Sequence, residues 1–67
     1  MYEELIKFIE QELDFCKNYA EDKHTKELFF HNAFGAVLWE SQRTGQDMDE
    51  FWEPYREEFI KTIEGRG

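Results

Sequence analysis

The sequence predicts an all-α fold in which three antiparallel helices form one small domain. Three segments repeat their apolar residues at helical spacings of three and four, and no segment alternates apolar and polar residues as a half-buried strand does. The two connections, near residues 20–24 and 44–48, are short, and short connections join antiparallel neighbours. Because we find no repeat and no linker, we expect residues 1–67 to form a single domain.

The first predicted helix spans about residues 2–20 and carries two apolar stripes. The main stripe consists of Tyr2, Ile6, Ile9, Leu13, Cys16 and Ala20. The second is aromatic and consists of Phe8, Phe15 and Tyr19. Glu12 projects between the two stripes, where a carboxylate must find a partner or reach water. The candidate partners are Arg43, Arg56 and His31. We expect the carboxylate of Glu12 to reach water instead.

The second predicted helix spans about residues 25–43 and is apolar over an unusually wide arc. Thr25 or Asp22 suits its N-cap, and Gly45 suits a left-handed residue after its end. Its apolar residues cover about 200° of the helical wheel, whereas a surface helix needs a stripe of only about 100°. They are Leu28, Phe29, Phe30, Ala33, Phe34, Ala36, Val37, Leu38 and Trp39. We therefore expect this helix to be central, with neighbours on at least two sides.

The third predicted helix spans about residues 49–64 and is expected to be shorter than the other two. Its apolar stripe consists of Met48, Phe51, Trp52, Tyr55, Phe59 and Ile63. Asp47 to Glu50 have the spacing of a capping box, with aspartate as the cap. Pro54 removes a backbone hydrogen bond, so the regular helix either starts near residues 50–53 or is kinked. Gly65, Arg66 and Gly67 should end the helix.

The charge and composition exclude several classes of protein. The chain carries 16 acidic and eight basic residues, a net charge of −8, which disfavours direct binding to nucleic acid or to an anionic membrane surface. Its longest apolar run has seven residues, far fewer than the roughly 20 that cross a bilayer. With no secretory signal pattern and Cys16 as the one cysteine, we expect a cytoplasmic protein.

No motif with recognised catalytic chemistry is present. There is no glycine-rich phosphate loop, and no serine or cysteine stands in a known motif with a histidine and an acid. His24 and His31 are seven residues apart, whereas helical metal ligands usually stand three or four apart. Glu27 and His31 have that spacing, but a surface pair explains them. We expect no catalytic residue, no cofactor and no bound metal.

The aromatic content favours self-association. Seven Phe and two Trp are difficult to bury within 67 residues, and small domains often pair, most commonly as dimers. One stripe of the second helix mixes apolar and polar members as an interface does. It consists of Leu28, Asn32, Gly35, Trp39 and Arg43. Two alternatives explain these residues. A tight crossing within the same chain, with Gly35 under another helix, is slightly favoured, and contact with a second subunit or a partner protein is the close second.

The sequence thus favours a non-enzymatic interaction module that self-associates, with a homodimer as the expected form. The alternative is an acidic regulator that occupies a basic site on another protein, as a mimic of DNA would. The net charge of −8 supports that alternative, although acidic surfaces also serve solubility. A metal-binding or catalytic protein that uses Glu27 and His31 has the least support.

Overall fold

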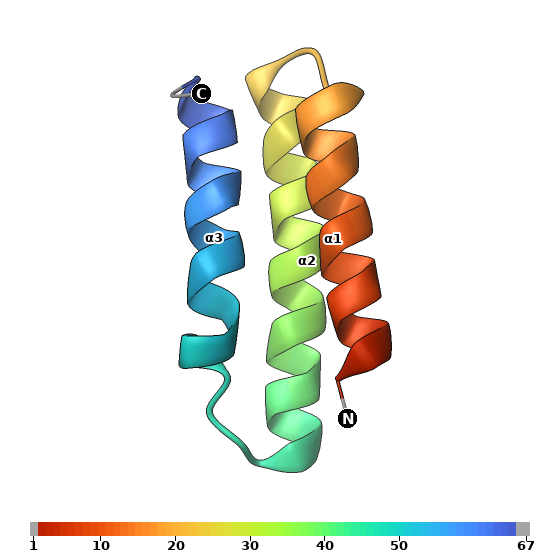
Figure 1. Cartoon of the computed structure of the whole chain (residues 1–67), viewed down its shortest axis with the longest axis vertical. Helices are drawn as coiled ribbons and strands as arrows, with labels where there is room; N and C mark the ends of the chain where they lie inside the picture. The colour runs from red at the N-terminus through yellow and green to blue at the C-terminus, as the bar shows by residue number, and fades with distance from the viewer. Residues whose placement is uncertain (1, 66–67) are drawn as a thin grey trace.

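Three helices make up the secondary structure of the computed structural model, which describes residues 2–65 (Figure 1). They are α1 (Glu3–Asn18), α2 (Lys23–Thr44) and α3 (Asp49–Glu64). Each helix packs against the other two, and consecutive helices run in opposite directions (Figure 1). Residues 2–65 contain no strand, so the predicted all-α fold of three antiparallel helices is confirmed.

The helix lengths differ from the prediction. α1 and α3 each have 16 residues and α2 has 22, so the expected pattern of two long helices and a shorter third is wrong. α1 ends at Asn18 because the carbonyl of Phe15 accepts bonds from the amides of both Tyr19 and Ala20, at 2.9 and 3.0 Å. The stripe that continues to Ala20 therefore ends in a turn: Ala20 is buried but not helical.

The ends of α2 follow local chemistry. The carboxylate of Asp22 accepts a bond from the Thr25 amide at 2.7 Å, so Asp22 is the N-cap, one of the two predicted candidates. This bond lowers the pKa of Asp22. At the other end Gly45 adopts φ 72°, the predicted left-handed conformation. α2 is therefore longer than expected, because its N-cap, Asp22, lies three residues before Thr25, the other predicted candidate.

The start of α3 differs from the prediction. The carboxylate of Asp47 accepts from the Asp49 amide at 2.9 Å, whereas a capping box would require the amide of Glu50. Met48 is the N-cap, without a side-chain hydrogen bond. Pro54 lies inside the helix, so a start between residues 50 and 53 is also wrong. The carbonyl of Glu50 loses its usual partner to Pro54, and both residues are exposed, where water can solvate that carbonyl.

The core lies along the common axis of the three helices. Its buried residues are Ile9, Cys16, Ala33, Val37, Met48, Trp52 and Phe59. Trp52 is the centre of an aromatic cluster, with ring centroids 6.0 Å from Phe59 and 6.1 Å from both Phe30 and Phe34. The cluster joins α3 to α2, which also packs against α1, so the prediction that α2 has neighbours on two sides is confirmed; α1 and α3 also contact each other, so α2 is not uniquely central.

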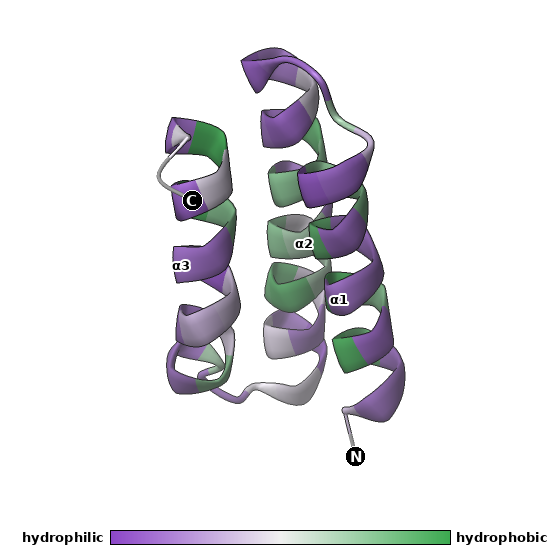
Figure 2. Ribbon diagram, turned by 45° about the horizontal axis from the view of Figure 1, so that its top comes forward, coloured by the Kyte–Doolittle hydropathy of each residue, from purple (hydrophilic) through white to green (hydrophobic). Residues whose placement is uncertain are grey.

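Hydropathy differs between the inner and outer sides of the helices. The side of α3 that faces α2 is largely hydrophobic and its outer side hydrophilic (Figure 2). α3 ends at Glu64 and is capped by Gly65, with φ 75°, while Arg66 and Gly67 lie outside the described residues. Across residues 2–65, no helix combines the length and the apolar composition that a membrane span requires.

Candidate interaction surface

The predicted stripe of α2 lies on the surface. Leu28 and Trp39 are 51% and 68% exposed, and the other three members, Asn32, Gly35 and Arg43, are exposed as well. A Cβ atom built on Gly35 would meet no atom within 4 Å. The alternative of a tight crossing within the chain is therefore wrong, because nothing in the described part of this chain covers Gly35.

A second exposed stripe lies beside it on α1. Tyr19 is 70% exposed and Phe8 is 37% exposed, although both belong to the predicted aromatic stripe. Phe15, the third member, is half-buried, with its ring 5.8 Å from that of Phe29 on α2 and 5.6 Å from that of Tyr19. The aromatic stripe of α1 therefore borders α2 on its outer side.

Glu12 and Asn32 join the two stripes near their middles. Glu12 is only 7% exposed, so the expectation that its carboxylate reaches water is wrong. The side chain of Asn32 hydrogen-bonds to it, in place of the three candidate partners suggested by the sequence.

These residues define one surface, which we call the α1–α2 face. It consists of Phe8 and Glu12 from α1, Tyr19 at the C-cap of α1, and Leu28, Asn32 and Trp39 from α2. Phe8 precedes Glu12 by four residues and Tyr19 follows it by seven; Leu28 and Trp39 stand at the same spacings from Asn32. Each helix therefore presents exposed apolar side chains about 16 Å apart, at 1.5 Å per residue. Because α1 and α2 are antiparallel, the four apolar residues frame the central pair.

The α1–α2 face points away from α3. The side of α2 that meets α3 is marked by Phe30 and Phe34, which contact Trp52. At 100° per residue, Trp39 lies about 180° from Phe30 and 140° from Phe34 on the helical wheel. α3 therefore leaves the α1–α2 face uncovered.

Burial dominates the electrostatics of the central pair. Burial raises the pKa of Glu12, and the hydrogen bond from Asn32 offsets part of that rise. The Oε2 atom of Glu12 has no hydrogen-bond partner among the described residues. An unpaired buried carboxylate is costly, and most such groups in proteins are paired. One oxygen of the Glu12 carboxylate is therefore unsatisfied, at the centre of an exposed apolar surface.

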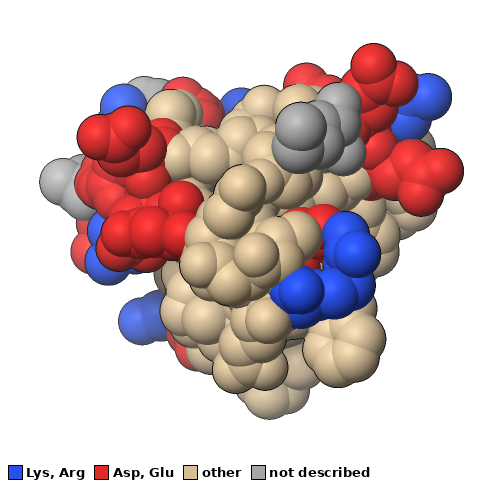
Figure 3. Space-filling model, turned by 90° about the horizontal axis from the view of Figure 1, so that it is seen from below, with Lys and Arg blue, Asp and Glu red and all other residues tan. Residues whose placement is uncertain are grey.

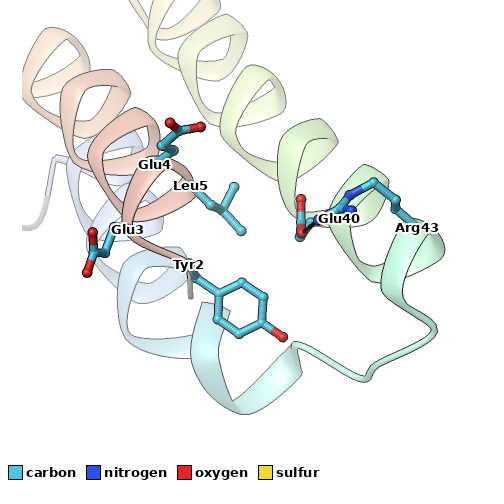
Figure 4. A pocket seen from close by; sticks show the side chains of 6 residues that line it. All are labelled: Tyr2, Glu3, Glu4, Leu5, Glu40 and Arg43. Atoms are coloured by element: carbon cyan, nitrogen blue, oxygen red, sulfur yellow. Dashed lines mark hydrogen bonds and ion pairs between the residues drawn. The ribbon is translucent and has the colours of Figure 1, made fainter.

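Charged residues border one end of this surface. Arg43 forms an ion pair with Glu40 beside a pocket that is also lined by Tyr2, Glu3, Glu4 and Leu5 (Figure 4). Tyr2 further donates a hydrogen bond from its hydroxyl to the side chain of Gln46 in the α2–α3 loop. Seen from this end, uncharged residues lie between two areas of acidic side chains (Figure 3). The acidic charge is thus separated into areas on either side of uncharged surface.

Two of the other predicted candidates, Glu27 and His31, share a pocket, and His24 does not line it. Glu27 and His31 line a pocket between α2 and α3 with Phe30, Ile60 and Ile63, while His24 is exposed elsewhere on α2. In residues 2–65, no three His, Cys, Asp or Glu side chains are grouped to hold a metal ion. Cys16 is fully buried, and burial raises its pKa despite the opposing effect of Lys26 and Lys17. A buried thiol of this kind is a packing residue.

Sequence reasoning found both halves of the α1–α2 face without joining them. The aromatic stripe of α1 and the mixed stripe of α2 were each visible in the periodicity. The link between them is Glu12, an acid between apolar stripes, together with an amide at Asn32 in the opposing helix. Comparison of the chain with protein-family models, curated proteins and solved structures finds no match.

Proposed function

We propose that this chain is a non-enzymatic protein-interaction module that self-associates through the α1–α2 face. The observation that carries the proposal is the exposure of Tyr19, Leu28 and Trp39 on one side of two adjacent helices. Aromatic residues are enriched in the centres of protein interfaces. An apolar surface bordered by polar residues is typical of an interaction site.

The dimensions of the bundle are sufficient for such an interface. The described chain measures 35 × 17 × 17 Å. A long side of these dimensions has a projected area of about 600 Å², close to the roughly 800 Å² per partner buried in a standard protein interface. Arg43, Glu40 and Glu4 would lie at the polar rim, beside the apolar centre.

A comparison of three alanine variants tests the proposal. Sedimentation equilibrium at high micromolar concentration should show a dimer for the unmodified chain. Leu28→Ala and Trp39→Ala should weaken association about tenfold or more, since interface anchors often contribute over 1 kcal/mol. Leu38→Ala is the matched control, because Leu38 is similarly exposed, at 46%, on the same helix but outside the α1–α2 face. A clean monomer at that concentration would contradict the proposal.

The acidic regulator remains a second proposal, supported by the charge on α3. Glu53 and Glu57 are exposed, and Arg56 approaches their carboxylates only at 3.8 and 3.9 Å. With a net charge of −8, such a surface could complement a basic site on another protein. Salt distinguishes the two functions: a complex with a basic site should weaken steeply as salt rises, whereas apolar self-association should not.

A further inference from the structure

The buried carboxylate at the centre of the α1–α2 face indicates how self-association would be controlled. We propose that two copies of this chain join α1–α2 face to α1–α2 face, and that Glu12 of each copy takes up a proton as they join. The inference rests on the proposed function and adds the occupant of the surface and the protons that accompany binding.

The distribution of charge favours a second copy as the occupant. Two chains of charge −8 repel each other except where their acidic side chains are kept apart. Glu12 is the one acidic residue among the six that define the α1–α2 face, and it is buried; the acids Glu4 and Glu40 lie with Arg43 at the end of the face. A basic partner would instead be attracted to the exposed acids elsewhere. The α1–α2 face therefore suits a partner that is equally apolar there.

The spacing of the residues fits an isologous pair. Phe8 and Leu28 stand at equal spacings before Glu12 and Asn32, and Tyr19 and Trp39 stand at equal spacings after them. In an antiparallel hairpin, this arrangement is approximately symmetric about the central pair. A twofold axis through the centre would bring the middles of two such faces together and form a four-helix arrangement. The two Glu12 side chains then lie near the middle of the shared interface.

No nearby charge compensates the carboxylate of Glu12. The residues one turn away on α1 are Phe8, Ile9, Phe15 and Cys16, of which only the buried thiol can titrate. From α2 the facing polar group is the uncharged amide of Asn32. α3 packs on the other side of the bundle, and among the described residues only burial and Asn32 shift the pKa of Glu12.

Association adds to the cost of charging Glu12. Glu12 is only 7% exposed in the single chain, so the added cost comes chiefly from the second carboxylate nearby, which disfavours ionisation and raises the pKa of Glu12 above its already raised value. At pH values between the pKa of Glu12 in the single chain and its pKa in the dimer, the dimer therefore binds more protons than two separate chains do. Association should tighten as the pH falls through that interval, by at most two protons per dimer.

Sedimentation equilibrium between pH 7 and pH 5 tests this inference, with Glu12→Gln and the control Glu10→Gln. Glutamine imitates the protonated acid, so E12Q should dimerise more tightly than the unmodified chain at pH 7. Between pH 7 and pH 5, the unmodified chain and E10Q should tighten about tenfold more than E12Q. Glu10 is exposed on α1, so E10Q reports the general effect of removing one negative charge.

Asn32→Ala provides a second readout that does not alter the acid. It removes the hydrogen bond that lowers the pKa of Glu12, so the pH at which association tightens should move upward. Circular dichroism at each pH confirms that the variants remain helical. If the unmodified chain dimerises but E12Q and E10Q share one pH profile, proton uptake at Glu12 is refuted and self-association stands. If the unmodified chain is monomeric at both pH values, both proposals fail.

Discussion

Gly35 offers the most direct separation of folding from association. Within one chain the position is open, because a Cβ atom there meets nothing within 4 Å. Glycine in a helix interior costs about 1 kcal/mol relative to alanine. Gly35→Ala should therefore raise the free energy of unfolding by about 1 kcal/mol, which raises the Tm by roughly 4–8 °C in a domain of this size.

Association should respond in the opposite direction when the added side chain is large. Gly35 lies beside Leu28 and Trp39 along α2, so a leucine there would project from the stripe that we expect to contact a second copy. Overpacking a well-fitted contact costs about 1–3 kcal/mol. This corresponds to a dissociation constant weakened by about fivefold to over a hundredfold. Gly35→Leu should thus yield a more stable but more monomeric protein.

Two measurements on the same samples check this expectation. Thermal unfolding, followed by circular dichroism at low micromolar concentration, reports the stability of the single chain. A Tm that does not change with protein concentration confirms that the sample is monomeric, since the Tm of a dimer depends on concentration. Sedimentation equilibrium at high concentration reports association. If Gly35→Leu unfolds the chain, our assignment of open space around Gly35 is wrong. If it folds and its dissociation constant is unchanged, the stripe is ordinary surface.

Three further predictions concern the core and the central acid. Phe59→Ala should lower the free energy of unfolding by about 3–5 kcal/mol in a urea titration, since Phe59 is fully buried; a loss below 1 kcal/mol would contradict the packing. Glu12→Gln should stabilise the single chain by about 1 kcal/mol at pH 7. Because the pKa of Glu12 is raised in the folded chain, the unmodified chain loses stability as the pH rises through that pKa, and the glutamine variant does not. The difference in unfolding free energy between the two proteins should therefore vanish near pH 4. Cys16 should react with a thiol reagent at pH 8 only as fast as the chain opens, so rapid labelling of the native protein would refute its burial.

The predictable parts of the fold depend on local chemistry. The cap at Asp22 and the left-handed Gly45 are both set within a few residues of the chain, so the sequence indicates them directly. The start of α3 depends on more than the capping pattern. Pro54 is accommodated in an exposed part of the helix, where the carbonyl that it leaves unpaired can bind water. Tertiary exposure of that kind is not encoded in the spacing of residues 47–50.

The environment of Glu12 was less predictable for a geometric reason. Whether a glutamate between two apolar stripes reaches water depends on the distance and rotation between α1 and α2. Periodicity fixes the direction of Glu12 from its own helix but gives no information on where Asn32 lies in the neighbouring one. The prediction of an exposed carboxylate therefore failed, although the sequence correctly identified Glu12 as an unusual residue.

The exposed aromatic residues follow from the number of helices available to cover α2. Most apolar residues of α2 cover about 200° of its circumference, twice the stripe of a typical surface helix, and Leu28 and Trp39 lie outside that arc. α1 and α3 cover the side that contains Ala33 and Val37, and neither covers Leu28 or Trp39. Residues 2–65 contain no fourth helix, so nothing within them covers these side chains. A second copy would supply two helices at once, and it would cover the aromatic residues of α1 in the same step.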